Sequence, residues 1–185
     1  MKHIRTALAL TLIPVIAHAH PGHAGNEAGG IGWGLAHPFT GLDHLLAALA
    51  VGMLAAYWRR ASLAAVFLAA GVLGGLGGAG MGTVAGLETA LALSVLAFGI
   101  ALAFRRRTVP STVLALVAVG AAAHGWAHGS EVAGGMGIAG ILVGTSAIVA
   151  LGAAAALAVG RVPRVITGIG VGIAAAAFAI MAGII

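Results

Sequence analysis

Apolar and polar residues occupy separate long blocks of this chain. Six apolar blocks follow one another, separated by short polar or basic connections, at about residues 36–57, 62–82, 86–104, 109–129, 136–159 and 165–184. Each block is close to the ~20 residues that a helix needs to cross the hydrocarbon core of a bilayer. The strict alternation of a membrane β-barrel is absent. The pattern therefore predicts an all-α, polytopic membrane bundle of about six transmembrane helices.

Positive charge marks every second connection between the blocks. Arg59 and Arg60 follow the first block, residues 105–107 the third, and Arg161 and Arg164 the fifth, whereas the other connections contain neither Lys nor Arg. Cytoplasmic loops of membrane proteins carry an excess of these residues. We therefore expect a multi-pass protein of the bacterial inner membrane with its N-terminus and C-terminus both periplasmic.

The first 19 residues have the pattern of a secretory signal peptide. Lys2 and Arg5 precede a short apolar core, which ends at the small-residue motif Ala17-His18-Ala19. Cleavage after Ala19 is predicted, with an uncleaved anchor as the alternative. The mature chain would then have a periplasmic, His- and Gly-rich tail over residues 20–34 and a six-helix transmembrane domain over residues 35–185.

Composition narrows the class of partner. The chain is 61% hydrophobic and 7% charged, whereas a soluble domain is roughly a quarter charged. The net charge of +5 sits in the short connections, so we expect a lipid bilayer around the protein and no nucleic-acid partner. The absence of cysteine excludes disulfides and thiolate metal ligands.

Glycine is concentrated in the second block, at positions 71, 74, 75, 77, 78, 80 and 82. Small residues allow helices to approach closely in lipid, so tight packing is one interpretation. A locally unwound segment is the other. Gly125 and Gly129 in the fourth block form a G-x-x-x-G pair, which predicts close approach of another helix at that point.

Histidines and acids break the apolar pattern at one side of the expected membrane only. His37, Asp43 and His44 begin the first block, and His124, His128 and Glu131 end the fourth. The alternating topology puts both groups on the periplasmic side. Glu88 starts the third block on the same side, where it complements a helix N-terminus.

The spacing of these residues favours a site for a divalent metal. His124 and His128 are four residues apart, so they share a helix face and form a good chelate for a first-row ion. His37 and His44 are seven apart, about 10 Å along a straight helix. They can mark successive sites, or the chain can bend at Gly41. Purely structural hydrogen-bonded histidines are the alternative.

Two further histidines lie in the predicted periplasmic tail. After cleavage, His20 would offer both its α-amine and its imidazole as ligands, with His23 nearby. Pro21 removes an amide that a square-planar backbone site would use. A plain polar tail without metal is the alternative. The three tryptophans, at positions 33, 58 and 126, lie near the expected membrane surfaces and are interpreted as interfacial anchors.

Two motifs resemble one known family. The sequence HPFTGLDHLLA, which begins at His37, resembles the first-helix motif of the HupE/UreJ nickel/cobalt permeases. AHGWAHGSE, which ends at Glu131, is similar to the second signature of that family, F-H-G-x-A-H-G-x-E. The resemblance implies metal roles for the six histidines and acids in these motifs. The family's usual methionine is Ala48 here, and its phenylalanine is Ala123.

The resulting hypothesis is a secondary transporter that imports Ni²⁺, with Co²⁺ as a second candidate, and is not an enzyme. The metal would be the substrate, and no organic cofactor is expected. Three alternatives do not transport: a cytochrome with histidine-ligated haem, an intramembrane zinc hydrolase with Glu131 as general base, and a metal-binding sensor.

Overall fold

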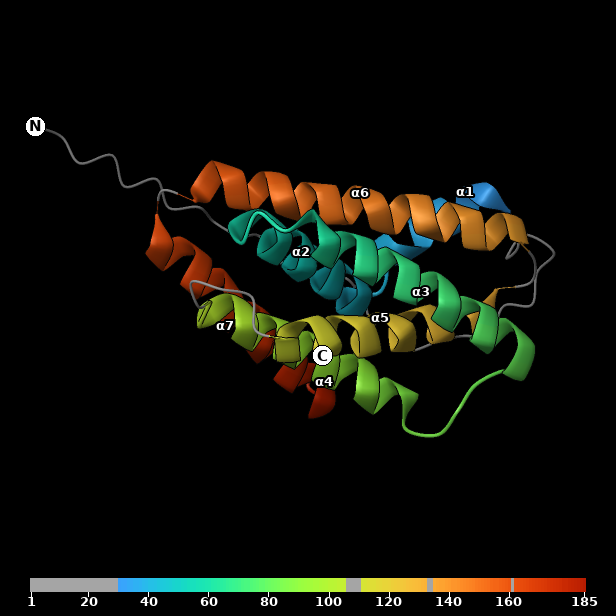
Figure 1. Ribbon diagram of the computed structural model, residues 1–185. Coiled ribbons are helices and arrows are strands. Elements are labelled where there is room, and N and C mark those ends of the chain that lie inside the picture. The colour runs from blue at the N-terminus through green and yellow to red at the C-terminus, as the bar shows by residue number, and fades with distance from the viewer. Residues whose placement is uncertain (1–29, 106–110, 133–134, 161) are drawn as a thin grey trace, which may run out of the picture.

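Each of the six predicted spans corresponds to helix in the structure. The computed structural model describes residues 30–105, 111–132, 135–160 and 162–185. Within these residues the elements are α1 (Ile31–Ala36), the 3₁₀ helix η1 (His37–Phe39), α2 (Leu42–Tyr57), α3 (Ala61–Met81), α4 (Leu87–Ala103), α5 (Ser111–Glu131), α6 (Gly135–Val159) and α7 (Pro163–Met181). The all-helical membrane bundle expected from the sequence is confirmed (Figure 1).

Two of the six spans depart from a straight helix of full length. Four helices, α3, α5, α6 and α7, are long and apolar enough to cross a membrane alone. The first predicted span is broken: α1 and η1 meet α2 at an angle of 79°. Helix α4 is apolar but has only 17 residues, about 26 Å, which is shorter than the ~30 Å hydrocarbon core.

The break in the first span has a local cause. Pro38 stands in the first turn of η1, and the Thr40 hydroxyl donates to the His37 carbonyl at 2.8 Å. Gly41 then takes an extended conformation and becomes the residue before α2. The new helix direction is stabilised by packing, because α1 lies against α6 with the glycine backbones of Gly34 and Gly137 in contact.

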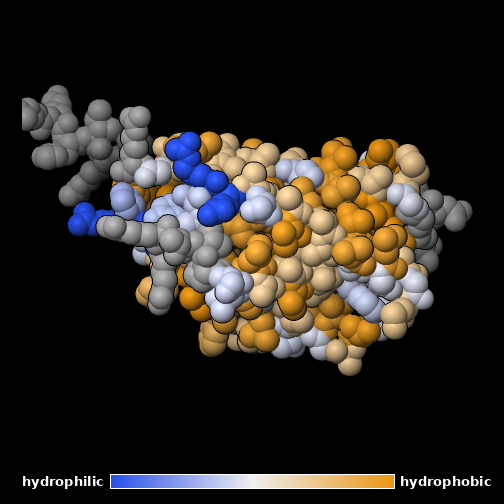
Figure 2. All heavy atoms as spheres, viewed as in Figure 1, coloured by the Kyte–Doolittle hydropathy of each residue, from blue (hydrophilic) through white to orange (hydrophobic). Residues whose placement is uncertain are grey.

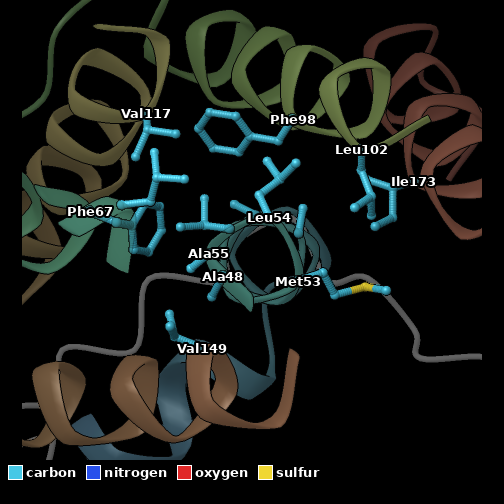
Figure 3. Close-up of a cluster of buried hydrophobic side chains, with 14 of the residues drawn as sticks. Ala48, Met53, Leu54, Ala55, Phe67, Phe98, Leu102, Val117, Val149 and Ile173 are labelled. Atoms are coloured by element: carbon cyan, nitrogen blue, oxygen red, sulfur yellow. The ribbon is translucent and has the colours of Figure 1, made fainter. Parts of the chain in front are cut away.

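Helix α2 lies at the centre of the bundle. Figure 3 shows it nearly end-on, with Phe67 of α3, Phe98 of α4, Val117 of α5, Val149 of α6 and Ile173 of α7 around it. Its residues from Ala47 to Ala55 are mostly buried. The middle of α2 is therefore held by the spans packed around it.

The α3–α5 pair shows what the glycine-rich block does. Helix α3 is continuous from Ala61 to Met81. The alternative of an unwound segment is therefore wrong for the glycines up to Gly80, and only Gly82 lies outside the helix. At four positions an added methyl group would overlap a carbonyl oxygen of the other helix. The pairs are Gly74 with Ala122, Gly78 with Trp126, Gly125 with Gly71, and Gly129 with Gly75. The close approach predicted from G-x-x-x-G is confirmed.

Polar groups gather at the two ends of the bundle. We call the end with Arg59, Arg60, Arg105 and Arg164 the arginine end, and the end where α2 begins and α5 finishes the histidine end. Figure 2 shows strongly hydrophilic residues gathered at one end and a mainly hydrophobic flank. Arg105 donates to the Pro163 carbonyl at 2.7 Å and to Thr167 at 2.9 Å, which ties α4 to α7.

Candidate metal centre

Three separate segments bring the motif residues together at the histidine end. η1 carries His37, the first turn of α2 carries Asp43 and His44, and the last turns of α5 carry His124, His128 and Glu131. The structure thus brings all six predicted residues into one region. His20 and His23, with the signal peptide, lie outside the described residues.

The first group consists of His37, His128 and Glu131. Each offers one ligand atom, and these atoms lie within 4.8 Å of one another. Nε2 of His37 is 3.3 Å from a carboxylate oxygen of Glu131. His128 is buried, whereas the side chain of Glu131 is 29% exposed. This group therefore extends from the interior of the protein to its surface.

The second group, Asp43, His44 and His124, lies deeper. Its ligand atoms are also within 4.8 Å of one another. One Asp43 oxygen accepts both the His44 backbone N–H and His44 Nδ1, each at 2.8 Å. The carboxylate thereby fixes the orientation of the His44 ring. A carboxylate behind an imidazole is the usual outer partner of a metal-binding histidine.

The imidazole rings link the two groups. The His44 ring centroid is 4.1 Å from that of His128 and 4.7 Å from that of His124. His128 in turn is 5.0 Å from His37. The sequence suggested that His124 and His128 chelate one ion. The structure places them in different groups because His44 of α2 packs against both.

Several imidazole nitrogens in this cluster have no hydrogen-bond partner among the described residues. They are Nε2 of His44, Nδ1 of His124 and Nδ1 of His128, and all three are buried. A buried polar atom without a partner is costly, so such an atom in a native fold calls for an explanation. A lone pair kept for a metal ion provides one.

A small cavity adjoins these nitrogens. It has a volume of about 60 Å³ and is lined by residues of α2, α3, α5 and α6, among them His44, His124 and His128. The other lining residues are mostly apolar and include Phe67 and Ile141. The histidines are therefore the main polar side chains at the edge of an otherwise apolar space. Organic-ligand pockets typically measure about 300–1,000 Å³.

Helix ends add a favourable field for a cation. The last turn of α5, with its negative dipole end, carries His128 and Glu131. The first turn of α2 would present the opposite, positive end, and Asp43 sits there to counter it. Mixed imidazole and carboxylate ligands of this kind suit borderline first-row divalent metals.

Sequence reasoning missed two residues of the site. Ser94 of α4 lies 2.9 Å from Nε2 of His124, and Trp33 of α1 stacks on His37 with ring centroids 4.3 Å apart. Neither contact has a sequence signal, since Ser94 sits in an apolar block and Trp33 looked like an interfacial anchor. Glu88 is exposed in the first turn of α4 and belongs to neither group.

The fold and this cluster define a multi-pass helical membrane protein with a partly buried cluster of histidines and carboxylates. Comparison with known proteins makes the assignment specific. The chain belongs to the HupE/UreJ family, whose model, described as HupE / UreJ protein, matches residues 8–180. It is 42% identical over 136 residues to Protein HupE of Rhizobium leguminosarum bv. viciae. This alignment covers 69% of this chain and 67% of that relative. No solved structure matches it.

Proposed function

We propose that this protein is a permease that imports Ni²⁺, and with it Co²⁺, across the bacterial inner membrane. Membership of the HupE/UreJ family supports a role in nickel and cobalt uptake. The observation that carries the proposal is the cluster of buried imidazole nitrogens, next to Asp43 and Glu131, that have no hydrogen-bond partner within the described ranges. Such a cluster in a lipid-embedded bundle is suited to a desolvated divalent cation.

The two groups suggest the order in which the ion moves. The group of His37, His128 and Glu131 extends to the surface through Glu131, so it would meet the ion first and replace part of its water. Asp43, His44 and His124 lie deeper and would take the ion next. His44 contacts rings of both groups, so the transfer needs only a short displacement.

Depth in the membrane fits this order. The 16 residues of α2 span about 24 Å. With the arginine end at the cytoplasmic surface, α2 would therefore begin several ångströms below the opposite surface of a ~30 Å core. The second group would then lie within the membrane, and both termini would be periplasmic. The predicted tail with His20 and His23 would deliver ions from that side.

The size of the cavity favours a bare ion over the haem alternative. About 60 Å³ beside the histidines is far below the volume of a porphyrin pocket. A metal sensor or a zinc hydrolase would use the same residues, so only movement of the ion distinguishes these functions from a permease.

Radiolabelled nickel uptake tests the proposal. Cells would express the wild type, His44→Ala, His128→Ala, or Ser146→Ala as a control whose hydroxyl bonds within α6. We expect uptake in the wild type and control, and none above background in the histidine variants at equal membrane levels. Excess cold cobalt, zinc or copper would rank the competing metals. Uptake that persists in both histidine variants would refute the site.

Proteoliposomes separate transport from binding. Purified protein would be reconstituted around a nickel-sensitive dye, and external Ni²⁺ added. Dye response with the wild type but not with His128→Ala supports a permease. Binding of Ni²⁺ to the purified protein without any dye response would instead support a sensor.

A further inference from the structure

Ser94 is buried in the protein interior beside the second group. Among the described residues the buried polar side chains are Ser94, His124 and His128. Ser94 comes from the middle of α4, whereas both histidines belong to α5. Its hydroxyl therefore joins α4 to a metal-ligand candidate on α5.

Both contacts of the Ser94 hydroxyl can be hydrogen bonds at the same time in only one arrangement. Its Oγ lies 2.7 Å from the Leu91 carbonyl oxygen, which can only accept, so the single hydroxyl proton goes there. The same Oγ lies 2.9 Å from Nε2 of His124. Since the hydroxyl has no second proton, it accepts, and Nε2 of His124 must carry the proton.

This direction fixes the tautomer of His124. A neutral imidazole has one N–H, so a proton on Nε2 leaves a lone pair on Nδ1. Nδ1 of His124 is one of the buried atoms without a hydrogen-bond partner among the described residues. The atom left bare by the Ser94 contact is thus also the atom that the protein leaves unpaired.

His44 is held in the corresponding way by a different group. Asp43 accepts from Nδ1 of His44, which leaves Nε2 bare, and Nε2 is buried with no hydrogen-bond partner in the part of the chain that the structure describes. The two rings lie 4.7 Å apart. An acceptor on one side of each ring leaves one bare nitrogen on each: Nε2 of His44 and Nδ1 of His124. Asp43 does so with a charge, and Ser94 does so without one.

We propose that Ser94 is a positioning residue that holds His124 in its Nε2–H tautomer, so that Nδ1 is the metal-binding atom. The proposal rests on the proposed metal site and adds to it the ligand atom and the residue that selects it. Because Ser94 is neutral, it orients His124 without adding negative charge to the Asp43 group. The binding strength of the site then depends on a hydroxyl that does not touch the metal.

The direct test is the tautomer in the metal-free protein. Full-length protein in lipid nanodiscs, labelled with ¹⁵N-histidine, would be studied by long-range ¹H–¹⁵N NMR, with His124→Asn assigning the signals. We expect protonated Nε2 and bare Nδ1, and a shift of Nδ1 on adding Zn²⁺ as a diamagnetic probe. A proton on Nδ1 of His124 in the wild type would overturn the proposal.

Variants supply the second test. Ser94→Ala should mix the two tautomers and weaken Zn²⁺ and Ni²⁺ binding by about 10–100-fold, as loss of an outer partner does. Ser94→Thr keeps the hydroxyl and should restore both, while Ser146→Ala should change neither. Unchanged tautomer and affinity in Ser94→Ala would refute the role.

The two proposals fail separately. The tautomer is read without metal, so it stands even if uptake persists in His128→Ala. Conversely, uptake could be lost in His44→Ala while His124 of the wild type carries its proton on Nδ1. That combination would overturn only the role of Ser94.

Discussion

Gly78 and Gly80 of α3 form a matched pair for testing whether helix spacing sets the metal site. A Cβ on Gly78 would lie 2.9 Å from the Trp126 carbonyl carbon and 3.0 Å from the Ser130 nitrogen, both on α5. A Cβ on Gly80 would have nothing within 4 Å. Both residues lie in the last turns of the same helix, so alanine changes their helix propensity alike.

The expected effects follow from these distances. Ordinary contact begins at 3.4 Å, and the atom nearest the added Cβ is the Trp126 carbonyl oxygen, which it would overlap. Gly78→Ala therefore requires α3 and α5 to separate by about 1 Å. Overpacking of this kind costs about 1–3 kcal/mol, and the propensity gain of about 1 kcal/mol is common to both variants. Gly78→Ala should therefore be about 1–3 kcal/mol less stable than Gly80→Ala.

Metal affinity should separate the two variants as well. Functional sites tolerate displacements of only about 0.5 Å, and α5 carries His124 and His128. Gly78→Ala should therefore bind Ni²⁺ more weakly, while Gly80→Ala should bind like the wild type. Unfolding in detergent and a Ni²⁺ titration of each purified variant provide the measurements. Equal stability and equal affinity of the two would refute the reasoning.

Three further substitutions test other contacts. Asp43→Asn keeps an acceptor for His44 but loses the charge, so Ni²⁺ affinity should fall about 10–100-fold. Equilibrium dialysis measures this, and an affinity of the variant equal to that of the wild type would show that the charge is not needed. Ni²⁺ should quench the fluorescence of Trp33, which stacks on His37; quenching unchanged in Trp33→Phe would place the ion elsewhere. Arg105→Lys should lower stability by about 1–2 kcal/mol, because an ammonium does not reproduce the guanidinium's bonds to α7, and an unchanged Tm would contradict this.

The limits of the spans could be predicted because a helix needs about 20 apolar residues to cross the hydrocarbon core of a bilayer. The apolar block at 62–82 became Ala61–Met81, and the block at 136–159 became Gly135–Val159. The break before α2 was only partly predictable. Pro38 and Gly41 mark where the chain can turn, but the 79° angle depends on α1 packing against Gly137 of α6, about a hundred residues away.

Sequence spacing picked out the candidate ligands but not the two groups in which the structure places them. The i, i+4 rule places His124 and His128 on one face and cannot show that the ring of His44 packs against both. Ser94 was missed because its contact with His124 depends on the register of α4 against α5. A single serine in an apolar block has no periodic signal.

The central position of α2 has a consequence for how the protein is assembled in the membrane. Among the described spans it is synthesised first, yet its buried faces are covered by residues from all the later helices, including Ile173 and Ala177 of α7. Until the later helices are made, this segment, with Asp43 and His44 at its start, stays in lipid or in the insertion machinery without its packing partners. A chain truncated before α7 would leave one face of α2 open, so assembly of the bundle is completed only when the last helix arrives.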